Sequence, residues 1–148
     1  MAEIYIGIDP GVNTGVAFWD TKARKLVRLL TCSIVRAMDE IDGFRGCVTR
    51  DVAVVFEDAR KRKWIPREKS LSQFKGRAMG AGSVRRDCDI WEEYCTARGI
   101  PFEAVAPRPG ATKWDADYFA KVTGWTGRTS NHARDAALLV FGKSASAR

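Results

Sequence analysis

The hydrophobic positions in the first part of this chain form short runs that end in turn-forming residues, a pattern typical of β-strands. The run IYIGID over Ile4–Asp9 stops at Pro10-Gly11, and TGVAFWD over Thr14–Asp20 follows so closely that the two are predicted to form an antiparallel hairpin. A third strand is predicted over Lys25–Val35. The segment Asp51–Asp58 is almost wholly apolar, which predicts a strand buried on both faces of a sheet.

The rest of the pattern predicts helices and one more strand. Apolar residues recur at helical spacing between Arg85 and Arg98, and Gly99 is a C-terminal cap signal. The apolar run Ile100–Pro107 predicts a fifth strand. Further helices are predicted over Arg36–Cys47, from a capping box at Thr112 and Asp115 to about Val122, and from a cap at Ser130 or Asn131 to about Gly142. This order predicts an α/β fold in one domain, residues 1–148, with a mixed five-stranded sheet, antiparallel over the first three strands and then parallel, flanked by helices.

The positive charge of the chain is concentrated in one segment, which we call the basic segment, residues 60–77. The whole chain carries a net charge of +7, and the basic segment alone accounts for it, because it holds eight basic residues and one acid, Glu68. Basic residues around an aromatic side chain suit the phosphates and bases of nucleic acid, although a solvated loop or a basic run resembling a localisation signal is the alternative interpretation. The candidate DNA-binding residues here are Arg60, Lys61, Arg62, Lys63, Trp64, Arg67, Lys69, Lys75 and Arg77.

The cysteines and the apolar runs bear on the compartment. Cys32, Cys47, Cys88 and Cys95 form no CxxC pair, which predicts reduced thiols rather than disulfides or a zinc site. No apolar run approaches the roughly 20 residues of a membrane helix, and the N-terminus lacks the pattern of a signal peptide. We therefore expect a cytoplasmic protein without a membrane partner.

Two acids end predicted buried strands, and two polar residues begin the last helix. Asp9 closes the first strand and Glu57 the fourth, and ligands of open α/β sheets collect outside the carboxyl ends of strands. His132 and Asp135 lie three apart in NHARDAALL and so share a helix face. Carboxylates and imidazole are ligands for divalent metals, so these four residues predict a two-metal site of the kind that hydrolyses phosphodiesters.

Each of these four residues also has a simpler explanation. Asp9 could cap the Pro-Gly turn, and Glu57, beside Asp58, could be a charge at the rim of a hairpin. His132 could have no task, and Asp135 could be an acid favoured by the helix dipole in the first turn. The prediction of a site therefore rests on all four residues falling in suitable elements.

The chain resembles the RuvC-type Holliday junction resolvases of the ribonuclease H-like superfamily, in the compact form often carried by bacteriophages. The resemblance covers Ile4 to about Leu139, nearly the whole chain. The segments that carry it are IGIDPGVNTG, VVFED, GRAMGAGSV, GIPFEAVAPR and HARDAALL.

This resemblance implies a function and a set of site residues. Asp9, Glu57, His132 and Asp135 match the residues that bind Mg²⁺ or Mn²⁺ in the family and hydrolyse phosphodiesters at a four-way DNA junction. It also implies a homodimer that nicks two strands symmetrically, and a cytoplasmic location in a bacterial host. After the glutamate the family has an aromatic that inserts into the junction, for which Trp64 is the stand-in, and it places lysines after the fifth strand, where Lys113 is the nearest match and a candidate DNA contact.

Other functions fit parts of the same pattern. IGIDPGVNTG also resembles the first hairpin of the actin-like ATPases and sugar kinases, but those proteins need a second copy of the fold to enclose ATP, so no nucleotide cofactor is expected. A non-catalytic DNA-binding module would keep the basic segment without metal chemistry. A ribonuclease acting on RNA–DNA hybrids would share the site.

Overall fold

A computed structural model describes residues 2–63, 71–108 and 113–145, without the side chains of residues 71, 72, 74 and 76–78. Its centre is a five-stranded sheet in the order β3-β2-β1-β4-β5. The strands are β1 (Ile4–Asp9), β2 (Thr14–Asp20), β3 (Lys25–Cys32), β4 (Val52–Glu57) and β5 (Phe102–Val105). β1, β2 and β3 pair antiparallel, whereas β1 with β4 and β4 with β5 pair parallel, which confirms the predicted mixed α/β sheet.

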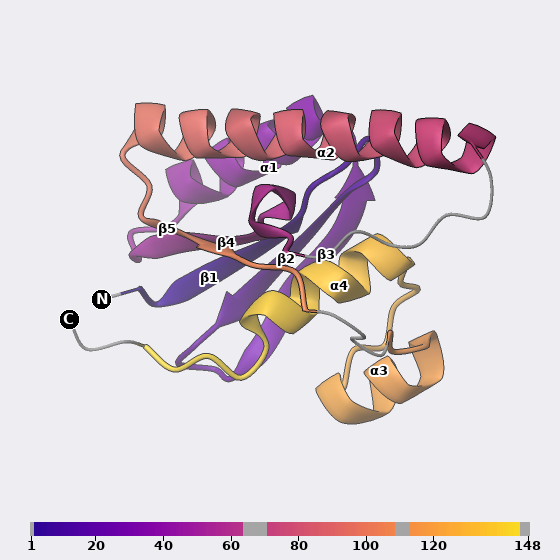
Figure 1. Ribbon diagram of the computed structural model, residues 1–148. Coiled ribbons are helices and arrows are strands. Elements are labelled where there is room, and N and C mark those ends of the chain that lie inside the picture. The colour runs from indigo at the N-terminus through magenta and orange to yellow at the C-terminus, as the bar shows by residue number, and fades with distance from the viewer. Residues whose placement is uncertain (1, 64–70, 109–112, 146–148) are drawn as a thin grey trace.

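Helices cover both faces of the sheet (Figure 1). They are α1 (Ile34–Cys47), the short 3-10 helix η1 (Ala59–Lys61), α2 (Leu71–Arg98), α3 (Ala116–Thr123) and α4 (Asn131–Val140). α1 and α2 lie on one face, and α4 crosses the other, with α3 beyond it at the lower edge of the view. Among the described residues, no helix is long and apolar enough to cross a membrane.

Strand alternation divides the apolar side chains between two cores. Ile4, Ile6 and Ile8 of β1 belong to a core that includes Trp91 of α2, and Trp91 is fully buried. Tyr5 belongs to the other core, with residues of β2 and α4. The two faces of β4 contribute to both cores, as its unbroken apolar run predicts.

Several element boundaries differ from the predicted ones. β3 ends at Cys32 because the Ser33 side chain caps α1, which therefore begins two residues earlier than predicted. α2 begins at Leu71 rather than Arg85, so the end of the basic segment is helical. The cap of α3 is Asp115, whose side chain accepts the backbone N–H of Tyr118 at 2.8 Å, whereas Thr112 lies outside the described residues.

Of the remaining details, two agree with the sequence prediction and two do not. Ser130 caps α4, as one of the two predicted residues, and all four cysteines are free thiols. β5 is shorter than predicted, at Phe102–Val105, and the short helix η1 was not predicted.

Candidate functional site

Two glycines let helix α4 lie directly on the sheet. A Cβ added to Gly15 of β2 would stand 2.0 Å from the carbonyl oxygen of His132, and one added to Gly7 of β1 would stand 2.1 Å from that of Ala136. Any side chain at either position would therefore push the helix backbone away. Gly15 also pairs with Asp9 across the hairpin, so the same close approach places the first turn of α4 beside Asp9.

Asp9 and Glu57 end neighbouring parallel strands at the same level. The last pair between β1 and β4 joins Ile8 to Phe56, and each acid is the next residue along its strand. Because side chains alternate, both acids are directed to the opposite face from Ile8 and Phe56, which is the face that α4 covers. The predicted convergence of two strand-end carboxylates is thus present in the strand register.

The first turn of α4 contacts Asp9 through His132. The Nδ1 atom of His132 lies 3.0 Å from Oδ2 of Asp9, and the imidazole is about half exposed. The start of the helix is fixed by Ser130, whose side-chain oxygen accepts the N–H of Ala133 and lies 2.5 Å from the hydroxyl oxygen of Thr31 in β3. The pairing of His132 with Asp9 is thus built on a capped helix end that is tied to the sheet.

Asp135 contacts a lysine that follows β5. The Lys113 ammonium donates to Oδ2 of Asp135 at 3.0 Å, and this bond, together with the charges of Asp135, Asp9 and Glu57, raises the pKa of Lys113. The lysine therefore lies within the field of three carboxylates. It bonds directly to one of the predicted ligands of the metal site.

The carboxylates of this cluster repel one another. Burial raises the pKa of Asp9, and the charge of Asp135 adds to this, whereas the hydrogen bond with His132 acts in the opposite direction. Burial also raises the pKa of Glu57, with further contributions from the charges of Asp9 and Asp135. Acids held together at such a cost in free energy are typical of functional sites rather than of structural ion pairs.

The donors suit a hard divalent cation, although they do not form a finished coordination sphere. Carboxylate oxygens and one imidazole are suitable ligands for Mg²⁺ or Mn²⁺. Among the described side chains, no group of three or more His, Cys, Asp and Glu residues is placed so that it could hold a metal ion. A cation would therefore have to draw these side chains together and displace Lys113 from Asp135.

Two cations of the basic segment are already bonded within the protein, which the sequence did not predict. The Arg60 guanidinium pairs with Asp58 at 2.8 Å, Asp89 at 2.8 Å and Glu92 at 2.6 Å, so a DNA phosphate would compete with three carboxylates for it. Lys61 donates to the carbonyl of Ala104 at 2.6 Å. Neither side chain is free to follow a DNA backbone in this arrangement.

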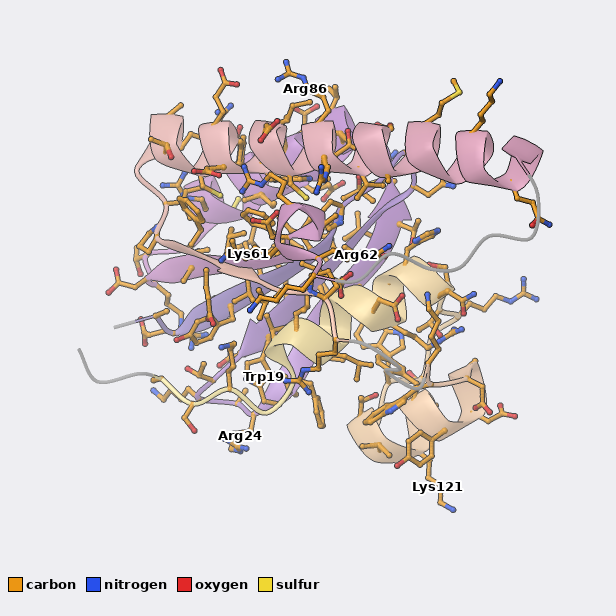
Figure 2. The ribbon with its side chains drawn as sticks, in the orientation of Figure 1. Trp19, Arg24, Lys61, Arg62, Arg86 and Lys121 are labelled. Carbon is orange, nitrogen blue, oxygen red and sulfur yellow. The ribbon has the colours of Figure 1, made fainter. Side chains whose placement is uncertain are left out.

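The remaining predicted DNA contacts are distributed along the chain. The positive charge of Arg62, which is labelled in Figure 2, lowers the pKa of Glu57, so Arg62 lies near that carboxylate. Lys63 and Lys75 are exposed. Trp64, Arg67 and Lys69 lie outside the described residues, as does the side chain of Arg77.

Three functional features were missed in the sequence. Asp58, beside Glu57, is 1% exposed, and the hydrogen bonds from Arg60 lower its pKa, so of this acidic pair only Glu57 belongs to the site. The close approach at Gly15 and the burial of Arg134 were not predicted either. The available signal for Arg134 was its place three residues before Ala137, on the face of the helix that carries apolar residues.

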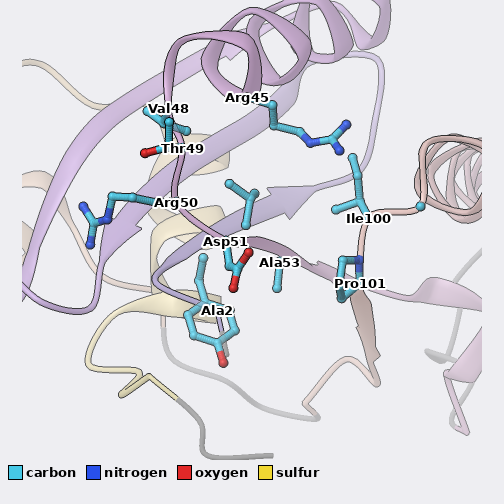
Figure 3. A pocket seen from close by; sticks show the side chains of 12 residues that line it. Ala2, Arg45, Val48, Thr49, Arg50, Asp51, Ala53, Ile100 and Pro101 are labelled. Carbon is cyan, nitrogen blue, oxygen red and sulfur yellow. The ribbon is translucent and has the colours of Figure 1, made fainter.

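A cavity of about 530 Å³ lies at the other end of the sheet (Figure 3). Residues before and at the start of β4, including Thr49, Arg50 and Asp51, line it together with Arg45 of α1 and Pro101 before β5. Arg50 pairs with Asp20 at 2.6 Å and with Glu3 at 3.7 Å, so its charge is already balanced. None of the residues that line the cavity belongs to the carboxylate cluster, so the two are separate.

Comparison with known proteins gives no family. No protein-family model and no curated protein matches the chain.

Proposed function

We propose that the protein is a metal-dependent endonuclease with a ribonuclease H-like fold that cleaves branched DNA, four-way junctions above all. The observation that supports this most strongly is the gathering of Asp9, Glu57, His132 and Asp135 from β1, β4 and α4 at one edge of the sheet. Two of these carboxylates have a raised pKa. These pKa values stay raised although Lys113 lowers both and His132 lowers that of Asp9, and a bound cation would relieve the repulsion further.

The four residues would hold Mg²⁺ or Mn²⁺, two ions in one site. When bound, the metal supplies Lewis-acid polarisation of the phosphodiester and lowers the pKa of a water molecule. The contributions of the chain are distinct. Asp9 and Glu57 present oxygen donors from strand ends that the sheet holds level, and His132 and Asp135 add donors from a helix fixed against that sheet.

The DNA would approach over the cations around this edge. Arg62 and Lys113 are close enough to influence the pKa of Glu57, and the exposed side chains of Lys63 and Lys75 would contact phosphates farther along the DNA backbone. The chain would act as a homodimer, because a four-way junction presents two symmetric strands for cleavage.

Cleavage of labelled DNA tests the proposal directly. A four-way junction, a flap, a linear duplex and an RNA–DNA hybrid are incubated with the protein and Mg²⁺ or Mn²⁺. We expect cleavage of the junction to exceed that of the duplex, and we expect Asp9→Asn and Asp135→Asn to abolish it while junction binding persists. Asp39→Asn, an exposed acid of α1, is the matched control and should retain full activity.

The same assay separates the competing functions. Full activity in both site variants would refute the assignment of the site. Preferential cleavage of the hybrid would identify a ribonuclease instead. Tight binding of the junction with no cleavage of any substrate in Mn²⁺ would favour a non-catalytic DNA-binding module.

A further inference from the structure

Arg134 is a buried arginine located between two residues of the candidate site. It lies in α4 between His132 and Asp135, yet it is only 8% exposed, so its guanidinium is directed into the protein rather than toward DNA. A buried guanidinium is costly unless its donors are satisfied. Its partners therefore indicate why it is there.

The guanidinium joins the segment after β5 to the residues that lead into α4. Nε donates to the carbonyl of Trp114 at 2.9 Å. Nη1 donates to the carbonyl and the hydroxyl of Thr129, at 2.8 and 2.7 Å, and Nη2 donates to Oδ1 of Asn131 at 2.5 Å. All of these acceptors are uncharged. The arginine is thus a rigid connection between loop backbones and the start of α4, and not one half of an ion pair.

The connection to Trp114 has a direct consequence for the neighbouring lysine. Trp114 follows Lys113, and Arg134 precedes Asp135, so residues 113–114 are attached to residues 134–135 by two adjacent contacts, one of which is the 3.0 Å pair between Lys113 and Asp135. The lysine side chain is 71% exposed. An ion pair of that exposure contributes little by itself and does not hold a flexible side chain in one position.

We propose that Arg134 is a positioning residue, which fixes the backbone at Trp114 and thereby holds the Lys113 ammonium at the carboxylate cluster, where it binds a DNA phosphate. This inference rests on the proposed nuclease function for the task of Lys113. The positioning itself concerns only contacts within the chain and can be tested without DNA. Arginine suits this position because a planar fork reaches three acceptor groups at once, whereas the single ammonium of a lysine cannot.

The first test measures the reactivity of the Lys113 amine. The protein is treated with an amine-acetylating reagent well below its melting temperature, and the labelling rate of each lysine is followed by mass spectrometry. Lys121, exposed on α3, serves as the internal reference. We expect Lys113 to be labelled more slowly than Lys121 in the wild type, and we expect Arg134→Lys to accelerate labelling of Lys113 several-fold without changing Lys121.

Two further variants keep this test decisive. Arg128→Lys makes the same exchange at an exposed arginine six residues away and should leave the labelling of Lys113 unchanged. If Arg134→Lys does not fold, Thr129→Val removes only one hydroxyl acceptor and should give a smaller acceleration at Lys113. An unchanged rate at Lys113 in a folded variant that has lost these contacts would overturn the proposal, whether or not the protein cleaves DNA.

A double-mutant cycle then tests whether Arg134 acts through Lys113. Junction affinity and the cleavage rate are measured for Arg134→Lys, Lys113→Met and the double variant. We expect each single change to weaken binding by a similar factor, and the double variant to be no weaker than Lys113→Met alone. Independent, multiplicative losses would show that Arg134 has only a general structural role. Absence of any cleavage would count against the nuclease while leaving the labelling result intact.

Discussion

Replacing Gly15 with alanine tests the packing on which the candidate site depends. The new Cβ would stand 2.0 Å from the His132 carbonyl oxygen and 2.4 Å from its carbon. Both are backbone atoms of α4, so no side-chain rotation relieves the clash. Restoring the 3.4 Å at which ordinary van der Waals contact begins requires the first turn of α4 and the sheet to separate by about 1.4 Å.

The cost of this separation follows from what α4 buries. Its contact face consists of three alanines and Val140, all at most 3% exposed. Burial of these side chains contributes roughly 5 kcal/mol at about 0.8 kcal/mol per carbon group. A gap larger than about 1 Å forfeits about half of the close-packing attraction, and if the helix does not move, overpacking strain of about 1–3 kcal/mol takes its place. We therefore expect Gly15→Ala to lower the free energy of unfolding by about 2–3 kcal/mol.

Thermal unfolding followed by circular dichroism measures this effect. A loss of this size lowers the melting temperature of a chain of this length by roughly 5–10 °C. The matched control is Gly43→Ala in α1, where an added Cβ meets nothing within 4 Å. Because alanine is the better helix former, the control should gain about 0.5–1 kcal/mol.

The same variant should also lose DNA cleavage, because displacing the start of α4 carries His132 away from Asp9. A Gly15→Ala protein that melts at or above the wild-type temperature would refute the claim that the helix backbone rests on this glycine. Equal destabilisation by Gly43→Ala would show that the loss reflects any glycine replacement rather than this contact.

Three further changes test the charges and the cap. Burial raises the pKa of Asp9 above its ordinary value of 3.8, so the ionised form of Asp9 destabilises the fold. In metal-free buffer, Asp9→Asn should therefore raise the free energy of unfolding at pH 7 by roughly 0.5–2 kcal/mol. Urea titrations at several pH values should show this gain shrinking as the pH falls through the folded-state pKa of Asp9 and vanishing below 3.8. Arg60→Met leaves the buried Asp58 carboxylate without its guanidinium partner and should lower the free energy of unfolding by about 3 kcal/mol in the same titration. Asp89→Asn removes a half-exposed partner of Arg60 and should lower it by under about 1 kcal/mol. Equal losses would contradict the claim that the pair with the buried Asp58 is the stronger one. Ser130→Ala removes the cap of α4 and should lower the free energy of unfolding by about 1 kcal/mol, and no loss would mean that the helix start is held by its other contacts.

The sequence by itself determined where the strands lie, that most of the other segments are helical, and which residues are candidates for the site. Short apolar runs bounded by turn residues or acids identify β1, β2 and β4, because a strand that is buried on both faces of a sheet carries apolar residues at successive positions. The positions of Asp9 and Glu57 at strand ends follow from the same pattern, since a carboxylate that terminates an apolar run also marks its edge. That these acids lie level follows from a parallel pairing, which the element order predicts.

Only the tertiary structure decided which charges are available and how the site is held. Arg60 and Arg62 are two residues apart in the same basic segment, but the first is bound by carboxylates from α2, 29 and 32 positions later in the chain. The sequence places Gly15 in the second strand, but only the packing of α4 shows that this position cannot carry a side chain. The role of Arg134 likewise follows only from its partners in the folded chain, such as the carbonyl of Trp114. Such contacts join residues far apart in sequence, and their strength depends on burial and distance, which are properties of the folded chain and not of any local pattern.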